Sequence, residues 1–101
     1  MEKYKKIMDM ETILDHHNQL LQNLNQVLNE FEESQKEYQR LRQYYYSEEF
    51  LQDVERADHG EIPSSVKCGV LSEDAVFDLI GDNFQAAIRM LETATKIIKE
   101  H

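Results

Sequence analysis

The fold is decided by residues 7–45, which read IMDMETILDHHNQLLQNLNQVLNEFEESQKEYQRLRQYY. Glycine and proline are absent from the first 59 residues, since Gly60 is the first glycine and Pro63 is the only proline. Inside a helix, glycine costs about 1 kcal/mol and proline about 3 kcal/mol, so a stretch without either permits one long helix. The apolar residues also recur at helical spacing, and we therefore predict a helix over about residues 2–45.

This helix carries a broad apolar stripe when Ile7 is taken as position a of a heptad repeat. The positions hold Ile7, Leu14, Leu21, Leu28, Gln35 and Arg42 at a; Met10, His17, Leu24, Phe31, Tyr38 and Tyr45 at d; and Ile13, Leu20, Val27, Ser34 and Leu41 at g. A two-stranded coiled coil needs only a and d to be apolar. A stripe that includes g is typical of a helix that packs against two neighbours in a bundle.

A short second helix is predicted over about residues 48–57, with Ser47 as its N-cap. It should end there because Gly60 and Pro63 follow. Residues 58–71 form a connector that contains four apolar side chains, and we expect this connector to pack rather than to swing freely.

A third helix is predicted over about residues 73–100, with Ser72 as its N-cap. The apolar period continues through Gly81, so we expect one helix without a break. Its apolar face holds Val76, Ile80, Phe84, Ala87, Leu91, Ala94 and Ile98, with Phe77, Ile88 and Ile97 beside them.

The predicted architecture is a single all-α domain of residues 1–101, an elongated helical hairpin or three-helix bundle with one long N-terminal helix. A chain of 101 residues buries only a modest core. Two layers of helix leave the broad stripe half covered, so we expect a homodimer to complete a four-helix bundle. A simple hairpin would bring Lys3, Lys5 and Lys6 near Lys96 and Lys99, and the dimer orientation, parallel or antiparallel, stays open.

The net charge of −9 is concentrated in residues 48–82, which hold ten acidic and two basic side chains. Such a surface repels nucleic acids and anionic membranes, and it suits a basic or helical protein partner. No stretch approaches the roughly 20 apolar residues of a membrane span. The single Cys68 cannot form an internal disulfide, and the cytoplasm is the default location.

No catalytic, cofactor or metal site is predicted. His16 and His17 are adjacent, and neighbours on a helix diverge by about 100°, so they do not readily bind one metal ion. The acidic segment lacks the loop spacing of a calcium site, and no His and Asp are spaced to activate Cys68.

An interaction surface is the remaining candidate. Three consecutive tyrosines, residues 44–46, span most of a helical turn, so at least one should face solvent while Tyr45 faces the core. The candidate surface comprises Tyr44, Tyr46, Glu48, Glu49, Asp53, Asp58, Glu73, Asp74 and Asp78.

Two segments resemble a known family. Residues 44–51, YYYSEEFL, and residues 69–80, GVLSEDAVFDLI, are similar to domain of unknown function 4298, and the second segment is the more specific. The resemblance covers essentially the whole chain and implies a bacterial, cytoplasmic protein of this size. It implies no activity and no site residues.

These observations favour a non-enzymatic protein–protein interaction or adaptor module. A small-molecule or metal-ion binding module is the alternative, and an enzyme is the third and least favoured class because no catalytic grouping is visible.

Overall fold

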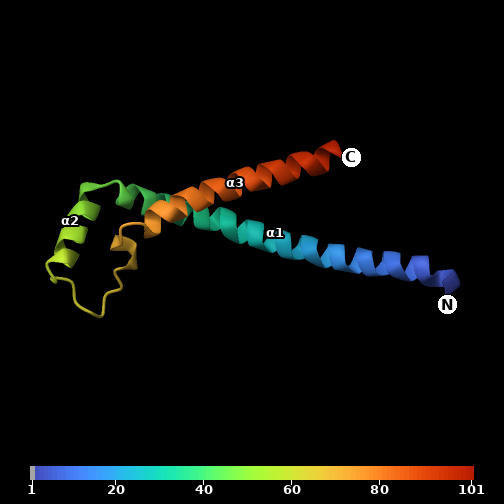
Figure 1. Cartoon of the computed structure of the whole chain (residues 1–101), viewed down its shortest axis with the longest axis horizontal. Helices are drawn as coiled ribbons and strands as arrows, with labels where there is room; N and C mark the ends of the chain where they lie inside the picture. The colour runs from blue at the N-terminus through green and yellow to red at the C-terminus, as the bar shows by residue number, and fades with distance from the viewer. Residues whose placement is uncertain (1) are drawn as a thin grey trace. The chain divides into compact units, whose positions relative to one another are not determined.

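The computed structural model describes residues 2–101, and all regular elements in this part of the chain are helical, with no strands (Figure 1). The element order is η1 (Glu2–Tyr4), α1 (Lys5–Tyr45), α2 (Glu48–Asp58), η2 (Gly69–Leu71) and α3 (Ala75–Lys99), where η denotes a 3₁₀ turn. The all-α class and the three helices, the first of them long, are confirmed.

The helix α1 runs for 41 residues without interruption, which at 1.5 Å per residue makes it about 62 Å long. Pairs of exposed side chains three or four residues apart reinforce it, such as Lys5 with Asp9 at 3.1 Å and Lys36 with Glu33 at 3.2 Å. Each such pair contributes only about 0.2–0.5 kcal/mol. These pairs are weak, and no side chain of α1 is buried in the single chain.

Contacts within the chain separate two compact units, of which the first ends at Tyr38 and the second is Gln39–His101. The first unit consists of helix, and the second contains the end of α1 together with α2, η2 and α3. The interpretation as one domain, packed as a hairpin or bundle, therefore stays a prediction.

The end of α2 is set by Gly60, which has a φ of +68°. The Gly60 amide donates to the Ala57 carbonyl at 3.1 Å, and the Glu61 amide donates to the Arg56 carbonyl at 2.9 Å. This pair of hydrogen bonds is the Schellman motif, whose left-handed residue is readily supplied by glycine. The predicted end of the second helix is thus explained by backbone geometry.

The predicted N-cap of the third helix, Ser72, is wrong. The Leu71 amide donates to Cys68 and the Ser72 amide to Gly69, so these residues form the 3₁₀ turn η2 instead. The helix α3 begins at Ala75, and the carbonyl of its N-cap, Asp74, accepts from the Asp78 amide at 2.8 Å. The prediction that α3 passes through Gly81 without a break is confirmed.

The core of the second unit is small. Among residues 2–101, only Phe50 (8% exposed) on α2 and Val76 (3% exposed) on α3 are buried hydrophobic side chains. Both α2 and α3 contact η2, which lies between them along the chain (Figure 1). The connector packs in part, because Ile62, Val70 and Leu71 are half-buried.

Two glycine substitutions should have opposite effects on the free energy of unfolding. Gly60→Ala should lower it by about 1–2 kcal/mol, because an alanine at this positive φ is strained. Gly81→Ala should raise it by about 0.5–1 kcal/mol, because the glycine lies within α3 and an added Cβ meets no atom within 4 Å. Urea denaturation measures both, and a neutral Gly60→Ala would contradict the role given to the C-terminal cap.

Candidate interaction surface

The turn between α1 and α2, which we call the elbow (Tyr44–Asp53), is fixed by Ser47. The Ser47 hydroxyl donates to the Tyr44 carbonyl at 2.6 Å and accepts from the Phe50 amide at 3.2 Å. One side chain thereby satisfies a carbonyl at the end of α1 and an amide at the start of α2. Glu48 and Glu49 follow in the first turn of α2, where negative charge is favourable.

An aromatic cluster fills the inside of the elbow. The buried Phe50 ring lies 5.5 Å from the Tyr44 ring, with the two planes perpendicular, and 5.0 Å from the Tyr45 ring. The Tyr46 ring lies 5.1 Å from that of Tyr45 but leaves 70% of its residue exposed. The three tyrosines therefore divide as the sequence indicates, with Tyr45 inward and Tyr46 outward.

A series of side-chain hydrogen bonds links Tyr44, Asp53 and Arg56 across the elbow. The Tyr44 hydroxyl donates to Asp53 Oδ2 at 2.6 Å, and Arg56 Nη1 donates to Asp53 Oδ1 at 2.6 Å. The pKa of Tyr44 is raised from 10.0 to about 12, first by burial and then by the hydrogen bond to Asp53 and the negative charges of Asp53 and Glu49. Arg56 opposes it.

The structure thus gives structural roles to two residues of the predicted surface, because Tyr44 and Asp53 are half-buried and bonded to each other. The Tyr44 hydroxyl and the Asp53 carboxylate are therefore already engaged within the chain. Tyr46, Glu48 and Glu49 are exposed beside the elbow.

The other acidic residues of the predicted surface are also exposed. Asp58 is the last residue of α2, Glu73 and Asp74 precede α3, and Asp78 lies in its first turn. The structure does not join them into one site, so the acidic surface stays a prediction.

The groups considered for chemistry lie apart from one another. His16 and His17 are exposed on α1, where they line a surface hollow with Thr12, Ile13 and Leu20. The Cys68 thiol is half-buried and donates to the Val66 carbonyl at 3.5 Å. In the part of the chain that the structure describes, no three His, Cys, Asp or Glu side chains gather as metal ligands would.

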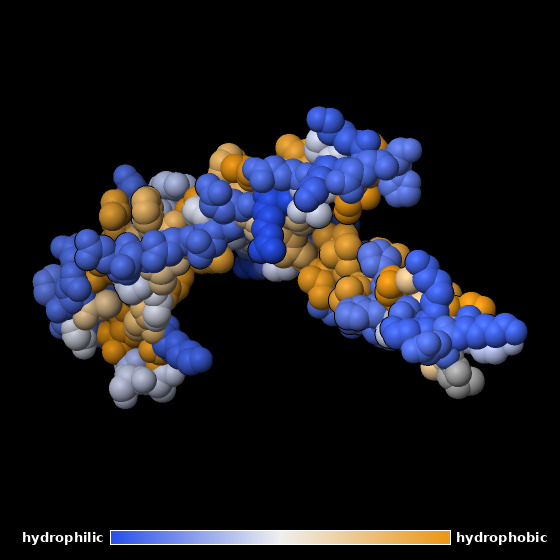
Figure 2. All heavy atoms as spheres, turned by 45° about the vertical axis from the view of Figure 1, so that its right-hand side comes forward, coloured by the Kyte–Doolittle hydropathy of each residue, from blue (hydrophilic) through white to orange (hydrophobic). Residues whose placement is uncertain are grey.

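The predicted stripe of α1 is exposed in the single chain over residues 7–27 (Figure 2). Eight of its side chains are 45–61% exposed: Ile7, Met10, Ile13, Leu14, Leu20, Leu21, Leu24 and Val27. We call these eight the α1 stripe. Leu24, at position d of this stripe, is 51% exposed in the single chain, because a lone helix cannot cover its own apolar face.

The apolar face of α3 also differs from the sequence interpretation. Val76 is buried and Ile80 is half-buried, but Phe84, Leu91 and Ile98 are exposed. Together with Phe77 these three form a line of exposed side chains, which we call the α3 stripe. Phe77, expected beside the face, lies on this line, and its seven-residue spacing from Phe84 is the sequence signal that indicates this position.

Comparison with known proteins identifies one family. The family model described as Domain of unknown function (DUF4298) matches residues 7–93. Among curated proteins, the chain matches none. None of the helices in residues 2–101 has the length and apolar character needed to cross a membrane.

The hydroxyl of Tyr44 should make stability fall at high pH. Because the folded-state pKa of about 12 exceeds the unfolded value of 10.0, the contribution is complete below pH 10 and is lost as pH rises through 12. Tyr44→Phe should lose about 1 kcal/mol at neutral pH and should lack that high-pH component. Urea denaturation between neutral pH and pH 12 measures this, with Tyr46→Phe, which removes an exposed hydroxyl, as the control. An unchanged pH profile in Tyr44→Phe would show that the bond to Asp53 is unimportant.

Proposed function

Because the chain belongs to the DUF4298 family, whose description assigns no activity, we propose from its own surface that it is a non-enzymatic protein–protein interaction module that forms a homodimer through the α1 stripe. The observation that carries this proposal is the exposure of the α1 stripe along about six turns of one unbroken helix.

A stripe of this kind is stable only when another surface covers it. A contiguous apolar surface on a soluble protein marks an interaction site more often than a feature of the isolated chain. The first unit contains no second helix that could cover the stripe from within. The a, d and g columns together give a face broad enough for two neighbours, which suits a bundle of several helices.

A second copy of the chain is the first partner proposed, because symmetric dimers are the commonest oligomers and the stripe recurs in each copy. The exposed acids beside the elbow and at the start of α3 suit a basic segment of a further protein, which would make the dimer an adaptor. We place this module in the bacterial cytoplasm, as the family resemblance and the single cysteine suggest.

A direct measurement separates this proposal from a small-molecule or metal-binding module. Native mass spectrometry and metal analysis of the purified protein should find the mass of two chains without a retained ligand. A ligand or metal ion at one equivalent per chain would overturn the interaction module and favour the alternative.

Substitution of Leu24 tests whether the α1 stripe is covered in the assembly. Leu24 is 51% exposed in the single chain, so Leu24→Ala would cost little unless a partner buries it. In the dimer we expect a loss of about 2–5 kcal/mol in stability and a shift toward monomer. Sedimentation and denaturation at several protein concentrations measure both effects.

The matched control is Asn25→Ala, which changes the adjacent position e and should leave the sedimentation profile near that of the unaltered protein. Small and equal effects at both positions would show that the α1 stripe is not the interface.

A further inference from the structure

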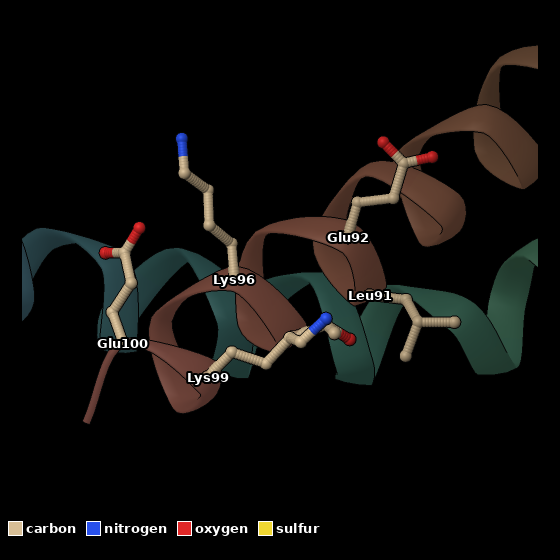
Figure 3. Close-up of a pocket in the computed structure, with 6 residues that line it drawn as sticks. Leu91, Glu92, Lys96, Lys99 and Glu100 are labelled. Carbon is tan, nitrogen blue, oxygen red and sulfur yellow. The ribbon is translucent and has the colours of Figure 1, made fainter.

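The α3 stripe forms a continuous line of exposed apolar side chains along α3. Phe77, Phe84, Leu91 and Ile98 are 65%, 65%, 69% and 73% exposed, and they follow one another at steps of seven residues. Side chains seven residues apart lie nearly in line along a helix. Leu91 projects away from Glu92 and Lys96 (Figure 3), and Lys99 lines the same surface hollow as Leu91.

A second column beside this line is formed largely of small residues. Three positions after Phe77, Phe84 and Leu91 come Ile80, Ala87 and Ala94, which take position d when Phe77 is position a. Between Phe84 and Ala94 the face of α3 therefore alternates between large side chains in one column and alanines in the other.

We propose that this face binds α3 of a second copy in antiparallel orientation. The proposal rests on the self-association proposed above and adds its orientation and register. When one helix is reversed, position a of one copy faces position d of the other. Phe84 then packs on Ala94 of the second copy, Leu91 packs on its Ala87, and Ile98 packs on its Ile80.

Side-chain volume favours this orientation over the parallel one. In the antiparallel pair, the Phe84–Ala94 and Leu91–Ala87 pairings each occur twice by symmetry, so four successive layers match a large side chain with an alanine and the helices can keep an even separation. In a parallel pair, Phe84 would meet Phe84 while Ala87 met Ala87 and Ala94 met Ala94. That arrangement alternates overpacked layers with cavities, and both are destabilising.

The charges of α3 favour the same orientation. The first half of the helix carries Asp78 and Asp82 and no base, whereas the second half carries Arg89, Lys96 and Lys99 against Glu92. Antiparallel pairing sets the acidic half of one copy beside the basic half of the other. Parallel pairing sets like charge beside like charge.

The apolar area of the α3 face is sufficient for a dimer whose copies also associate through the α1 stripe. Six exposed apolar side chains line this face of each copy: Phe77, Phe84, Met90, Leu91, Ile97 and Ile98. If each of these side chains loses on the order of 100 Å² of accessible surface, pairing of the two copies buries roughly 1,200 Å² in total. That area is the lower limit for stable interfaces.

Cysteine cross-linking tests both orientation and register. Cys68→Ser, which keeps a donor for the Val66 carbonyl, provides the background, and single chains carry either Phe84→Cys or Ala94→Cys. Mild oxidation of a mixture of the two chains should yield the mixed disulfide. Ala94→Cys alone should give roughly tenfold less product, because its own copies lie about 15 Å apart along the antiparallel pair, beyond the reach of a disulfide.

The outcomes separate the failure of this proposal from that of the proposed function. Efficient cross-linking of Ala94→Cys with itself would establish the parallel pair and overturn the inference. A dimer by sedimentation without the mixed disulfide would overturn only the α3 register. A monomeric Cys68→Ser parent would overturn self-association as well.

A second pair guards against a substitution that disturbs the fold. If the reduced Phe84→Cys chain loses its helical circular dichroism, Ile98→Cys mixed with Ile80→Cys replaces it. These positions also face each other in the antiparallel register, but they are 18 residues apart in a parallel pair. The mixed disulfide is again expected, and its absence in a dimer that keeps its helical signal overturns the register.

Discussion

A lone amphipathic helix cannot bury its own apolar side, and this constraint governs the molecule. The helix α1 has no internal glycine or proline to break it, and its intrahelical charge pairs contribute little. Its apolar columns are nevertheless regular over residues 7–27. Such a helix is stabilised by burial against other helices, so its sequence carries the requirement for a partner surface.

The elbow shows a different way of stabilising a small helical unit. Few residues of the second unit are buried, but Ser47, the Tyr44–Asp53–Arg56 chain and the Phe50 cluster concentrate directional interactions in one turn. Hydrogen bonds to charged groups are worth more than neutral ones. The direction in which α2 leaves α1 is therefore fixed locally, whatever surface covers the helices.

The sequence predicted those features that depend on local chemistry. The absence of glycine and proline predicted the length of α1, Ser47 predicted the start of α2, and Gly60 predicted its end. Ser72 was a wrong N-cap prediction because serine is also common in turns. The Ser72 amide donates to the Gly69 carbonyl within η2, before α3 begins. The bond between Tyr44 and Asp53 could not be read from the sequence, since it depends on the angle between two helices. The α3 stripe was readable from its seven-residue spacing, but only the structure separates Phe77 and Phe84 from the buried Val76.

The absence of tryptophan gives the aromatic elbow a spectroscopic consequence. Three of the five tyrosines lie in this one turn, and none of the other two shares a ring contact with it. Ultraviolet absorbance and intrinsic emission will therefore report mainly on whether the α1–α2 turn is closed. Dissociation of the α1 and α3 stripes from a partner would change tyrosine absorbance and emission little. Far-ultraviolet circular dichroism and hydrodynamic measurements are therefore needed to follow assembly.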